Sequence, residues 1–239
     1  QNFVILLLDA VDSREFSKLI AENPDYYEAF QDFTYFENAA GAYSCTERSV
    51  PFILTGKWYE NEMDFDEYVK QSYLESPLFA ELNNRGYRVE YYDPETYMDD
   101  DMAALFSNVH RVKFKMSSYF KFAKQELKLI GFRYAPFDLK KKCIFKMAGF
   151  NELALADDPE DKRTFTGADH EFAGRVEDAE ITTENNEKVF KYIHLEGAHV
   201  PLIYDENLNI IDELEGTYTM SVEASLKAAE DYLELLKKG

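Results

Sequence analysis

An uninterrupted apolar run, Phe3 to Leu8, lies near the start of the chain and ends at Asp9. Such a run is typical of a strand buried on both faces, at the centre of a mostly parallel sheet. Open α/β sheets bind ligands at the carboxyl ends of their strands, so Asp9 is expected at a functional edge. The run therefore predicts an α/β fold and gives Asp9 as a first candidate site residue.

Further strands and helices alternate along the chain. A helix expected at 78–85 is ended by Gly86 and followed by an alternating strand at 87–92. A second strand at 189–195 precedes an amphipathic helix at 221–238. This order predicts a doubly wound, mostly parallel sheet with helices on both faces.

The whole of 1–239 is expected to form one α/β domain, because its length suits a single large domain. Within it, we expect a short strand at 33–36, a helical insertion at about 95–150 and an irregular segment at about 151–187. Asp99 to Asp101 lacks the spacing of a calcium loop and is interpreted as a charged helix start. No run reaches transmembrane length, and the opening on a strand predicts an excised domain.

Thr46 stands before a short apolar segment that Gly56 closes. The pattern predicts a helix that starts at Thr46 and ends near Gly56. Two interpretations are open: Thr46 caps the helix, as many Thr residues do, or its hydroxyl acts beside an anion held by the positive helix end. The choice depends on which other residues the fold brings to this point.

The charge of the chain limits the kinds of partner that it can bind. The net charge of −20 disfavours nucleic acid as a partner, because a phosphate backbone needs a basic face. It also argues against docking on an anionic lipid surface through the charge of the domain itself. The local basic cluster Lys140–Lys142 is either a solvated face or a platform near a membrane.

Among the histidines, His199 follows a strand in a polar loop and is the candidate site residue. His194 is interpreted as a core residue, and His170 is not expected to be a ligand. Whether Cys45 and Cys143 form a disulfide is left open.

Several motifs together resemble the sulfatase-like branch of the alkaline phosphatase superfamily, especially membrane-anchored phosphoethanolamine transferases and lipoteichoic acid synthases. The motifs span nearly the whole chain and follow the order of the family. They are Phe3 to Asp9, Phe36-Glu37-Asn38, Thr46-x-x-Ser49-Val50-Pro51-x-Ile53-Leu54-Thr55-Gly56, Leu82-x-x-x-Gly86-Tyr87 and His194-Leu195-Glu196-Gly197-Ala198-His199-Val200-Pro201.

The resemblance implies a metal-dependent phosphotransferase or phosphodiesterase with a phospho-threonine intermediate at Thr46. Asp9 and Thr46 would hold a divalent zinc or manganese ion, and His199 and Asn38 would bind a phospholipid-like or glycan substrate. The domain is then expected on the extracytoplasmic face of a bacterial membrane, attached through segments outside this chain.

Two departures from the family limit these expectations. Cys45 lies one residue before the position of a sulfatase nucleophile and lacks its modification motif, which disfavours sulfate ester hydrolysis. The family's Asp-His-Gly metal motif is absent, so the fold is expected to be truncated at its C-terminal part, with half a metal site, weak or no metal occupancy and no turnover. The alternatives are a non-catalytic sulfatase-fold binding domain, a sulfatase-like hydrolase and a soluble phosphatase or phosphonoacetate-type hydrolase.

Overall fold

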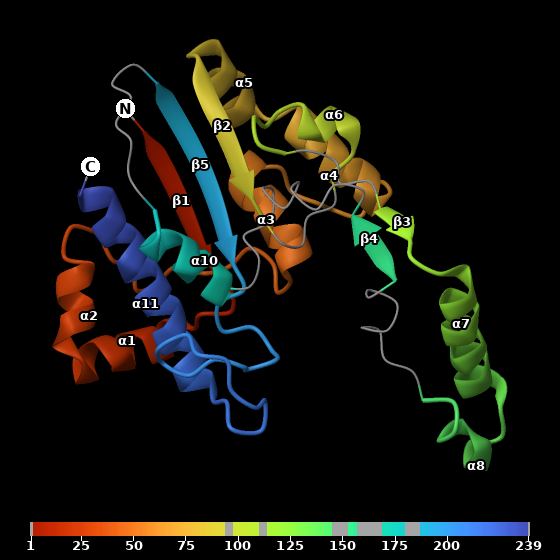
Figure 1. Cartoon of the computed structure of the whole chain (residues 1–239). Helices are drawn as coiled ribbons and strands as arrows, with labels where there is room; N and C mark the ends of the chain where they lie inside the picture. The colour runs from red at the N-terminus through yellow and green to blue at the C-terminus, as the bar shows by residue number, and fades with distance from the viewer. Residues whose placement is uncertain are drawn as a thin grey trace. The chain divides into compact units, whose positions relative to one another are not determined.

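The computed structural model of the chain describes residues 2–93, 98–109, 114–144, 153–156, 169–179 and 187–238 (Figure 1). The chain forms two compact units, each described separately below. The main unit comprises residues 1–109 and 163–239, and the second unit comprises residues 110–162. Residues 98–109, which we expected in the helical insertion, belong to the main unit.

The main unit is a mixed α/β structure built on a small open sheet of three parallel strands. These are β1 (Phe3–Leu8), β2 (Tyr87–Tyr92) and β5 (Lys188–Leu195), in the order β1-β5-β2. Leu8 pairs with Leu195, and Tyr92 pairs with Ile193, so the three carboxyl ends lie together. The prediction that β1 is central was wrong: β5 pairs with both neighbours, and Phe3 and Val4 of β1 are 46% and 40% exposed.

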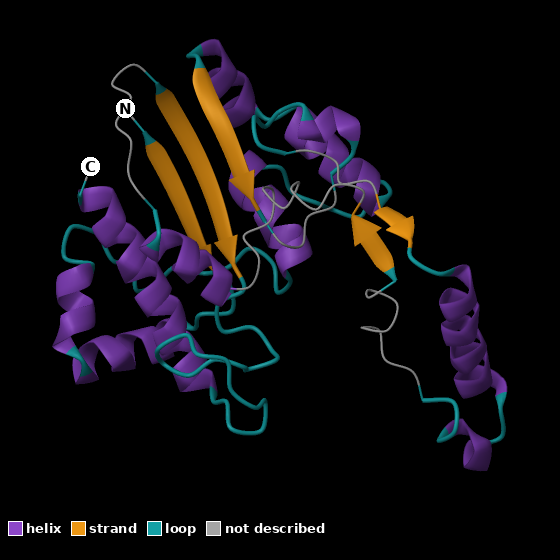
Figure 2. Cartoon of the chain, in the orientation of Figure 1, coloured by secondary structure: helices purple, strands orange, loops and turns teal. Residues whose placement is uncertain are grey.

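Helices cover both faces of this sheet, as Figures 1 and 2 show. On one face, α3 (Thr46–Thr55), α4 (Phe65–Leu74) and α5 (Pro77–Asn84) pack around Tyr192 of β5. On the other, α10 (Asp169–Glu177) and α11 (Tyr218–Lys237) pack around Ile193. Neighbouring strand residues point to opposite faces, so β5 contributes to both cores.

Local signals set several helix starts as the sequence predicts. Asp12 caps α1 (Ser13–Glu22), and its carboxylate accepts the amides of Arg14 and Glu15. Asp99 likewise caps α6 (Asp100–Ala103), in agreement with the charged helix start. Pro24 is the first residue of α2 (Pro24–Ala29), a position where its missing N–H costs nothing.

Two predictions of local structure were wrong, one of a strand and one of an irregular segment. Residues 33–36 form no strand but lie in a largely exposed loop, with Phe36 74% exposed. Residues 169–177, inside the stretch expected to be irregular, form α10, because Phe172 and Val176 lie one turn apart and pack against α11. The polar sequence around α10 concealed this narrow apolar face.

The described residues of the second unit include one pair of short strands and two helices. β3 (Phe114–Met116) pairs antiparallel with β4 (Ala154–Ala156). β3 lies in the segment expected to be a helical insertion and β4 in the segment expected to be irregular, so neither strand was predicted. Between them lie α7 (Tyr119–Tyr134) and α8 (Phe137–Lys140). Among the described helices, none is both long and apolar enough to cross a membrane.

Candidate functional site

The hydroxyl of Thr46 lies at the first residue of α3. Cys45, rather than Thr46, occupies the cap position of this helix, and its side chain makes no capping hydrogen bond. The helix ends at Gly56, as predicted, in the left-handed conformation with φ 72°. Val50 and Leu54 are buried in the core and hold the helix against the sheet. The interpretation of Thr46 as a helix cap was therefore wrong, and its hydroxyl has another partner.

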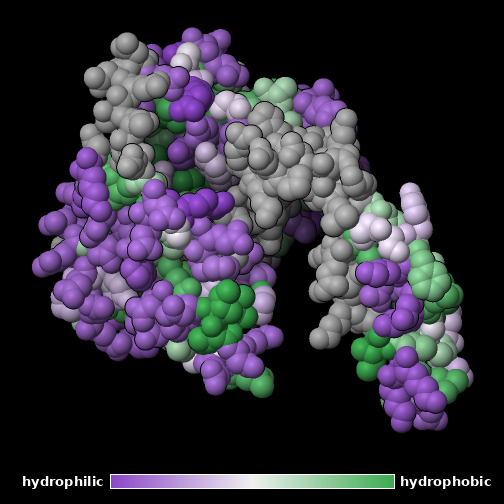
Figure 3. Space-filling model, in the orientation of Figure 1, coloured by the Kyte–Doolittle hydropathy of each residue, from purple (hydrophilic) through white to green (hydrophobic). Residues whose placement is uncertain are grey.

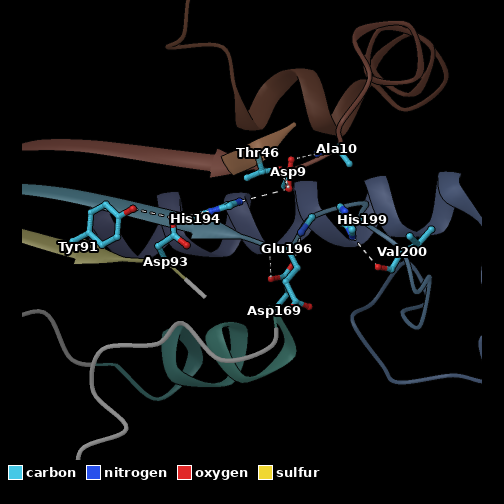
Figure 4. Close-up of polar contacts among 11 residues, drawn as sticks. Asp9, Ala10, Thr46, Tyr91, Asp93, Asp169, His194, Glu196, His199 and Val200 are labelled. Atoms are coloured by element: carbon cyan, nitrogen blue, oxygen red, sulfur yellow. Dashed lines mark hydrogen bonds and ion pairs between the residues drawn. The ribbon is translucent and has the colours of Figure 1, made fainter. Parts of the chain in front are cut away.

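That partner is Asp9, at the carboxyl end of β1. Thr46 Oγ1 donates a hydrogen bond to Asp9 Oδ2 over 2.9 Å, and the amide of Ala10 donates to Asp9 Oδ1 over 2.8 Å (Figure 4). Ala10 turns the chain away from the strand with φ 56°. The structure thus brings together the two residues that the sequence predicts as a pair, although they stand far apart in the chain.

Gly197 allows the loop after β5 to approach Asp9 closely. The amide of Ala198 donates to the carbonyl oxygen of Asp9 over 2.9 Å. Gly197 has φ 66°, and a Cβ at this position would lie 2.2 Å from the same carbonyl oxygen. A residue with a side chain would therefore clash with backbone atoms as well as strain its own backbone.

Asp169, the first residue of α10, anchors the same loop. Its carboxylate accepts the amides of Glu196 and Gly197 over 2.9 and 2.8 Å, and the residue is only 1% exposed. Burial raises the pKa of the Asp169 carboxyl, while the two amides act in the opposite direction. The loop beside Asp9 is thereby tied to the helix that covers the other face of the sheet.

His194 and Asp93 complete a buried network that the sequence analysis missed. His194 Nδ1 lies 3.2 Å from Asp93 Oδ2 (Figure 4). His194 Nε2 lies 3.8 Å from Asp9 Oδ2, which is too long for a hydrogen bond but still within the range of an ion pair. Tyr91 donates its hydroxyl to Asp93 Oδ2 over 3.0 Å. Asp93 directly follows β2, so the strand-end rule that selected Asp9 also selects Asp93.

The electrostatics of this network favour a charged imidazole. Burial lowers the pKa of His194, but its contacts with the carboxylates of Asp9 and Asp93 outweigh burial and raise the pKa to about 9. In turn, the neighbouring His194 lowers the pKa of Asp9 against the effect of burial, and Thr46 and Ala10 lower it further. At neutral pH the site therefore holds an imidazolium beside the Asp9 carboxylate.

Among the pockets lined by described residues, one borders Thr46 and another borders Asp9. The larger has a volume of about 650 Å³ and is lined by Thr46 and Asp93, together with acidic side chains of α3 and α4 such as Glu47 and Glu67. The smaller, of about 180 Å³, is lined by Asp9, His194 and His199. Thr46 therefore borders the larger pocket, and Asp9 borders the smaller one.

Two histidines and Asn38 remain, and they differ in their relation to the Thr46–Asp9 pair. His199 is exposed, borders the smaller pocket, and has its Nδ1 2.8 Å from the carbonyl oxygen of Val200. Asn38 lies in an exposed turn, and no contact among the described residues links it to Asp9 or Thr46. His170 lies on α10 rather than in a loop, with Nδ1 3.2 Å from the Tyr204 hydroxyl.

Cys45 and Cys143 are both free thiols in the structure. The question that the sequence left open, whether they pair, is answered in the negative for this structure. Cys45 is exposed immediately before Thr46, whereas Cys143 lies in the second unit.

The chemistry of Asp9 and Thr46 fits part of a divalent cation site. Carboxylate and hydroxyl oxygens are ligands that hard cations accept, and these two lie 2.9 Å apart. Within the part of the chain that the structure describes, no group of three or more His, Cys, Asp and Glu side chains is arranged to hold a metal ion. The described residues therefore provide two oxygen ligands rather than a full set.

The geometry thus places a hydroxyl, a carboxylate and an imidazole at the carboxyl edge of a parallel sheet. This is the edge at which α/β proteins commonly bind ligands. Comparison of the chain with protein-family models, with curated proteins and with solved structures yielded no match.

Proposed function

We propose that this chain belongs to a sulfatase-like, doubly wound α/β domain that transfers a phosphorus-linked group through Thr46. The observation that carries the proposal is the 2.9 Å hydrogen bond from Thr46 Oγ1 to Asp9 Oδ2. It joins a hydroxyl at a helix N-terminus to a carboxylate at a strand end, an arrangement that suits an activated nucleophile beside an anion site. The resemblance of the Thr46 and His199 motifs gives the reaction class.

In this proposal Thr46 Oγ1 attacks the phosphorus of a phosphodiester. The bond between phosphorus and Oγ1 forms, the bond from phosphorus to the leaving oxygen breaks, and the leaving alcohol takes up a proton. Asp9 accepts the hydroxyl proton, because the hydrogen bond already directs it there. A second alcohol or water then takes the group from Thr46. A divalent zinc or manganese ion bound by Asp9 and Thr46 would lower the pKa of the hydroxyl and offset substrate charge.

His194 and Asp93 support Asp9 rather than contact the substrate. Asp93 holds His194 at Nδ1, which leaves Nε2 directed to the carboxylate of Asp9. The resulting charge balance keeps Asp9 ionised, since its pKa is lowered. His199 borders the smaller pocket and is the side chain proposed to bind the substrate or leaving group. Asn38 is the second candidate for this role.

The substrate is proposed to be phospholipid-like or derived from the cell envelope, handled on the extracytoplasmic side of a bacterial membrane. The larger pocket offers about 650 Å³ beside Thr46. Its acidic lining favours a neutral or cationic group over a second anion.

Intact mass after incubation with manganese or zinc and a lipid phosphodiester tests the proposal. Phosphatidylethanolamine and phosphatidylglycerol are suitable donors. We expect one added group on the wild-type chain and on Thr46→Ser, which keeps a hydroxyl, and none on Thr46→Val. Multiple turnover is not expected, because the sequence contains no Asp-His-Gly motif.

Thr55→Val is the matched control, because the Thr55 hydroxyl lies on the same helix but donates to the carbonyl of Pro51. It should acquire the group as the wild-type chain does. An unchanged wild-type mass with every donor and metal, or labelling that persists in Thr46→Val, would contradict the proposal.

A second candidate is a non-catalytic binding domain with the same fold. The buried His194 favours it, because its positive charge already balances Asp9 without a metal ion. In that case phosphate would bind without any transfer to Thr46. Calorimetric binding of inorganic phosphate, combined with an unchanged protein mass, identifies this outcome.

A further inference from the structure

The second unit carries charge of the opposite sign to the rest of the chain. Residues 114–144 contain eight Lys and Arg against two Asp and Glu, a net charge of +6 in a chain with a net charge of −20. Charges of one sign concentrated on one segment act locally, because salt screens them beyond about 8 Å at physiological ionic strength. The negative net charge of the whole chain therefore does not determine the electrostatic potential at residues 114–144.

The same segment exposes several large apolar side chains on one face of α7. Tyr119, Leu127, Ile130 and Tyr134 are separated by eight, three and four positions, which places them on one face of a helix. They are 79%, 68%, 49% and 74% exposed, and the adjacent Phe120 is 82% exposed. We call these five residues the apolar stripe.

Packing among the described residues of the second unit does not bury this stripe. No side chain of α7 or α8, all of which the structure describes, is buried. Phe137 at the start of α8 is 87% exposed and extends the apolar surface beyond α7. In Figure 3 the green apolar residues of this unit lie at its surface beside purple polar ones. Exposed apolar surface of this kind marks an interaction site.

Basic side chains lie beside the stripe. Lys121, Lys124 and Lys128 are on α7, at helical positions next to the stripe, and Lys140–Lys142 follow on α8 and the turn after it. Aromatic and aliphatic residues on one helix face with lysines beside them form the pattern of helices that lie in a membrane interface. The lysines keep their ammonium groups in water while their stems extend along the apolar layer.

We propose that α7 and α8 dock the second unit on an anionic lipid bilayer, with the apolar stripe inserted at the interface and the lysines facing lipid headgroups. A second copy of this chain is a less suitable partner for the apolar stripe than a lipid bilayer, because two segments of net charge +6 repel each other. The proposal rests on the exposure and charge of this segment and does not depend on the proposed function of Thr46.

Co-sedimentation of the full chain with vesicles tests the proposal. Vesicles of phosphatidylcholine mixed with phosphatidylglycerol are compared with vesicles of phosphatidylcholine alone, at low and at physiological salt. We expect the wild-type chain to sediment with the anionic vesicles and to bind at least about tenfold less well to the neutral ones, because several lysines contribute at the surface. Added salt should weaken binding to the anionic vesicles.

Two variants separate the apolar and charged contributions. Leu127→Asp combined with Ile130→Asp interrupts the stripe, and Lys140→Glu, Lys141→Glu and Lys142→Glu together reverse the basic cluster. Each should reduce binding to anionic vesicles about tenfold or more. The matched control is Leu214→Asp in the main unit, which adds a charge at a side chain that is 95% exposed and should bind as the wild-type chain does.

Far-ultraviolet circular dichroism of each variant is the control that checks whether the fold is retained. The proposal is overturned if the wild-type chain does not sediment with anionic vesicles, or binds both vesicle types equally. It is also overturned if both sets of variants bind like the wild-type chain. A wild-type dimer in solution that Leu127→Asp converts to a monomer, without lipid binding, would assign the stripe to self-association instead.

Discussion

The strand-end site of the main unit and the α7–α8 segment of the second unit both contain charged side chains, but they differ in burial. His194 and Asp93 are 1% and 5% exposed, and their partners fix their geometry. On α7 the apolar stripe and the basic residues beside it are exposed to water. Charged residues should therefore affect stability and charge state in the strand-end site, and surface recognition in the α7–α8 segment. Substitutions in the two regions should change the free energy of unfolding by very different amounts.

The largest effect is expected from His194→Ala. It leaves the Asp93 carboxylate buried without its imidazole partner, which should lower the free energy of unfolding by about 3 kcal/mol or more. Urea denaturation measures the loss. His199→Ala is the control: His199 is exposed, so its removal should change the free energy of unfolding by less than about 0.5 kcal/mol. Equal effects of the two substitutions would show that the buried network does not hold the fold together.

A smaller effect of the same residue should appear as a pH dependence. The pKa of His194 is raised from 6.5 to about 9 on folding, so its charged contacts contribute fully below pH 6.5. This contribution should be lost as the pH rises through 9. Urea denaturation at a series of pH values should show stability decreasing over this window for the wild-type chain. In His194→Gln the decrease should be absent; a parallel decrease there would assign it to other groups.

Two glycines with similar backbone angles provide the next test. Gly197→Ala combines a positive φ with a Cβ contact to the Asp9 carbonyl oxygen, whereas Gly86→Ala has φ 72° and no atom within 4 Å of the new Cβ. We expect Gly86→Ala to cost about 1 kcal/mol, from the left-handed backbone alone. Gly197→Ala should cost at least about 1 kcal/mol more, because the backbone at Asp9 must move. Thermal unfolding of the two variants, measured side by side, checks the difference.

The smallest effect is expected in the second unit. Leu127→Asp changes an exposed side chain of α7, so the free energy of unfolding of the main unit should change by less than about 0.5 kcal/mol. Native-state hydrogen exchange of β5 amides measures it in the main unit alone. A large loss of protection there would mean that the stripe supports the core, which would remove the contrast between the two regions.

Much of the site could be predicted from the sequence because its signals are local. The apolar run before Asp9 predicts a strand, and the structure contains it as β1. The Thr46 and Gly56 signals predict the start and end of α3. A strand-end rule then gave Asp9 as a site residue, and the structure places it beside Thr46. Alternating apolar positions and turn residues are properties of short segments, and they are visible without knowledge of the fold.

Tertiary structure alone decided the rest. β5 rather than β1 is central, because strand order depends on pairing between segments that lie far apart in the chain. The same pairing brings His194 beside Asp93 and Asp9. The prediction that His194 is a core residue is confirmed by its 1% exposure, and the structure adds its carboxylate partners, which the sequence did not reveal. Exposure of the stripe on α7 was equally hidden, because the sequence shows which residues share a helix face but not whether another element covers it. The sequence determined the elements and the residue types at their ends, whereas long-range packing decided which of those residues meet, and with what charge.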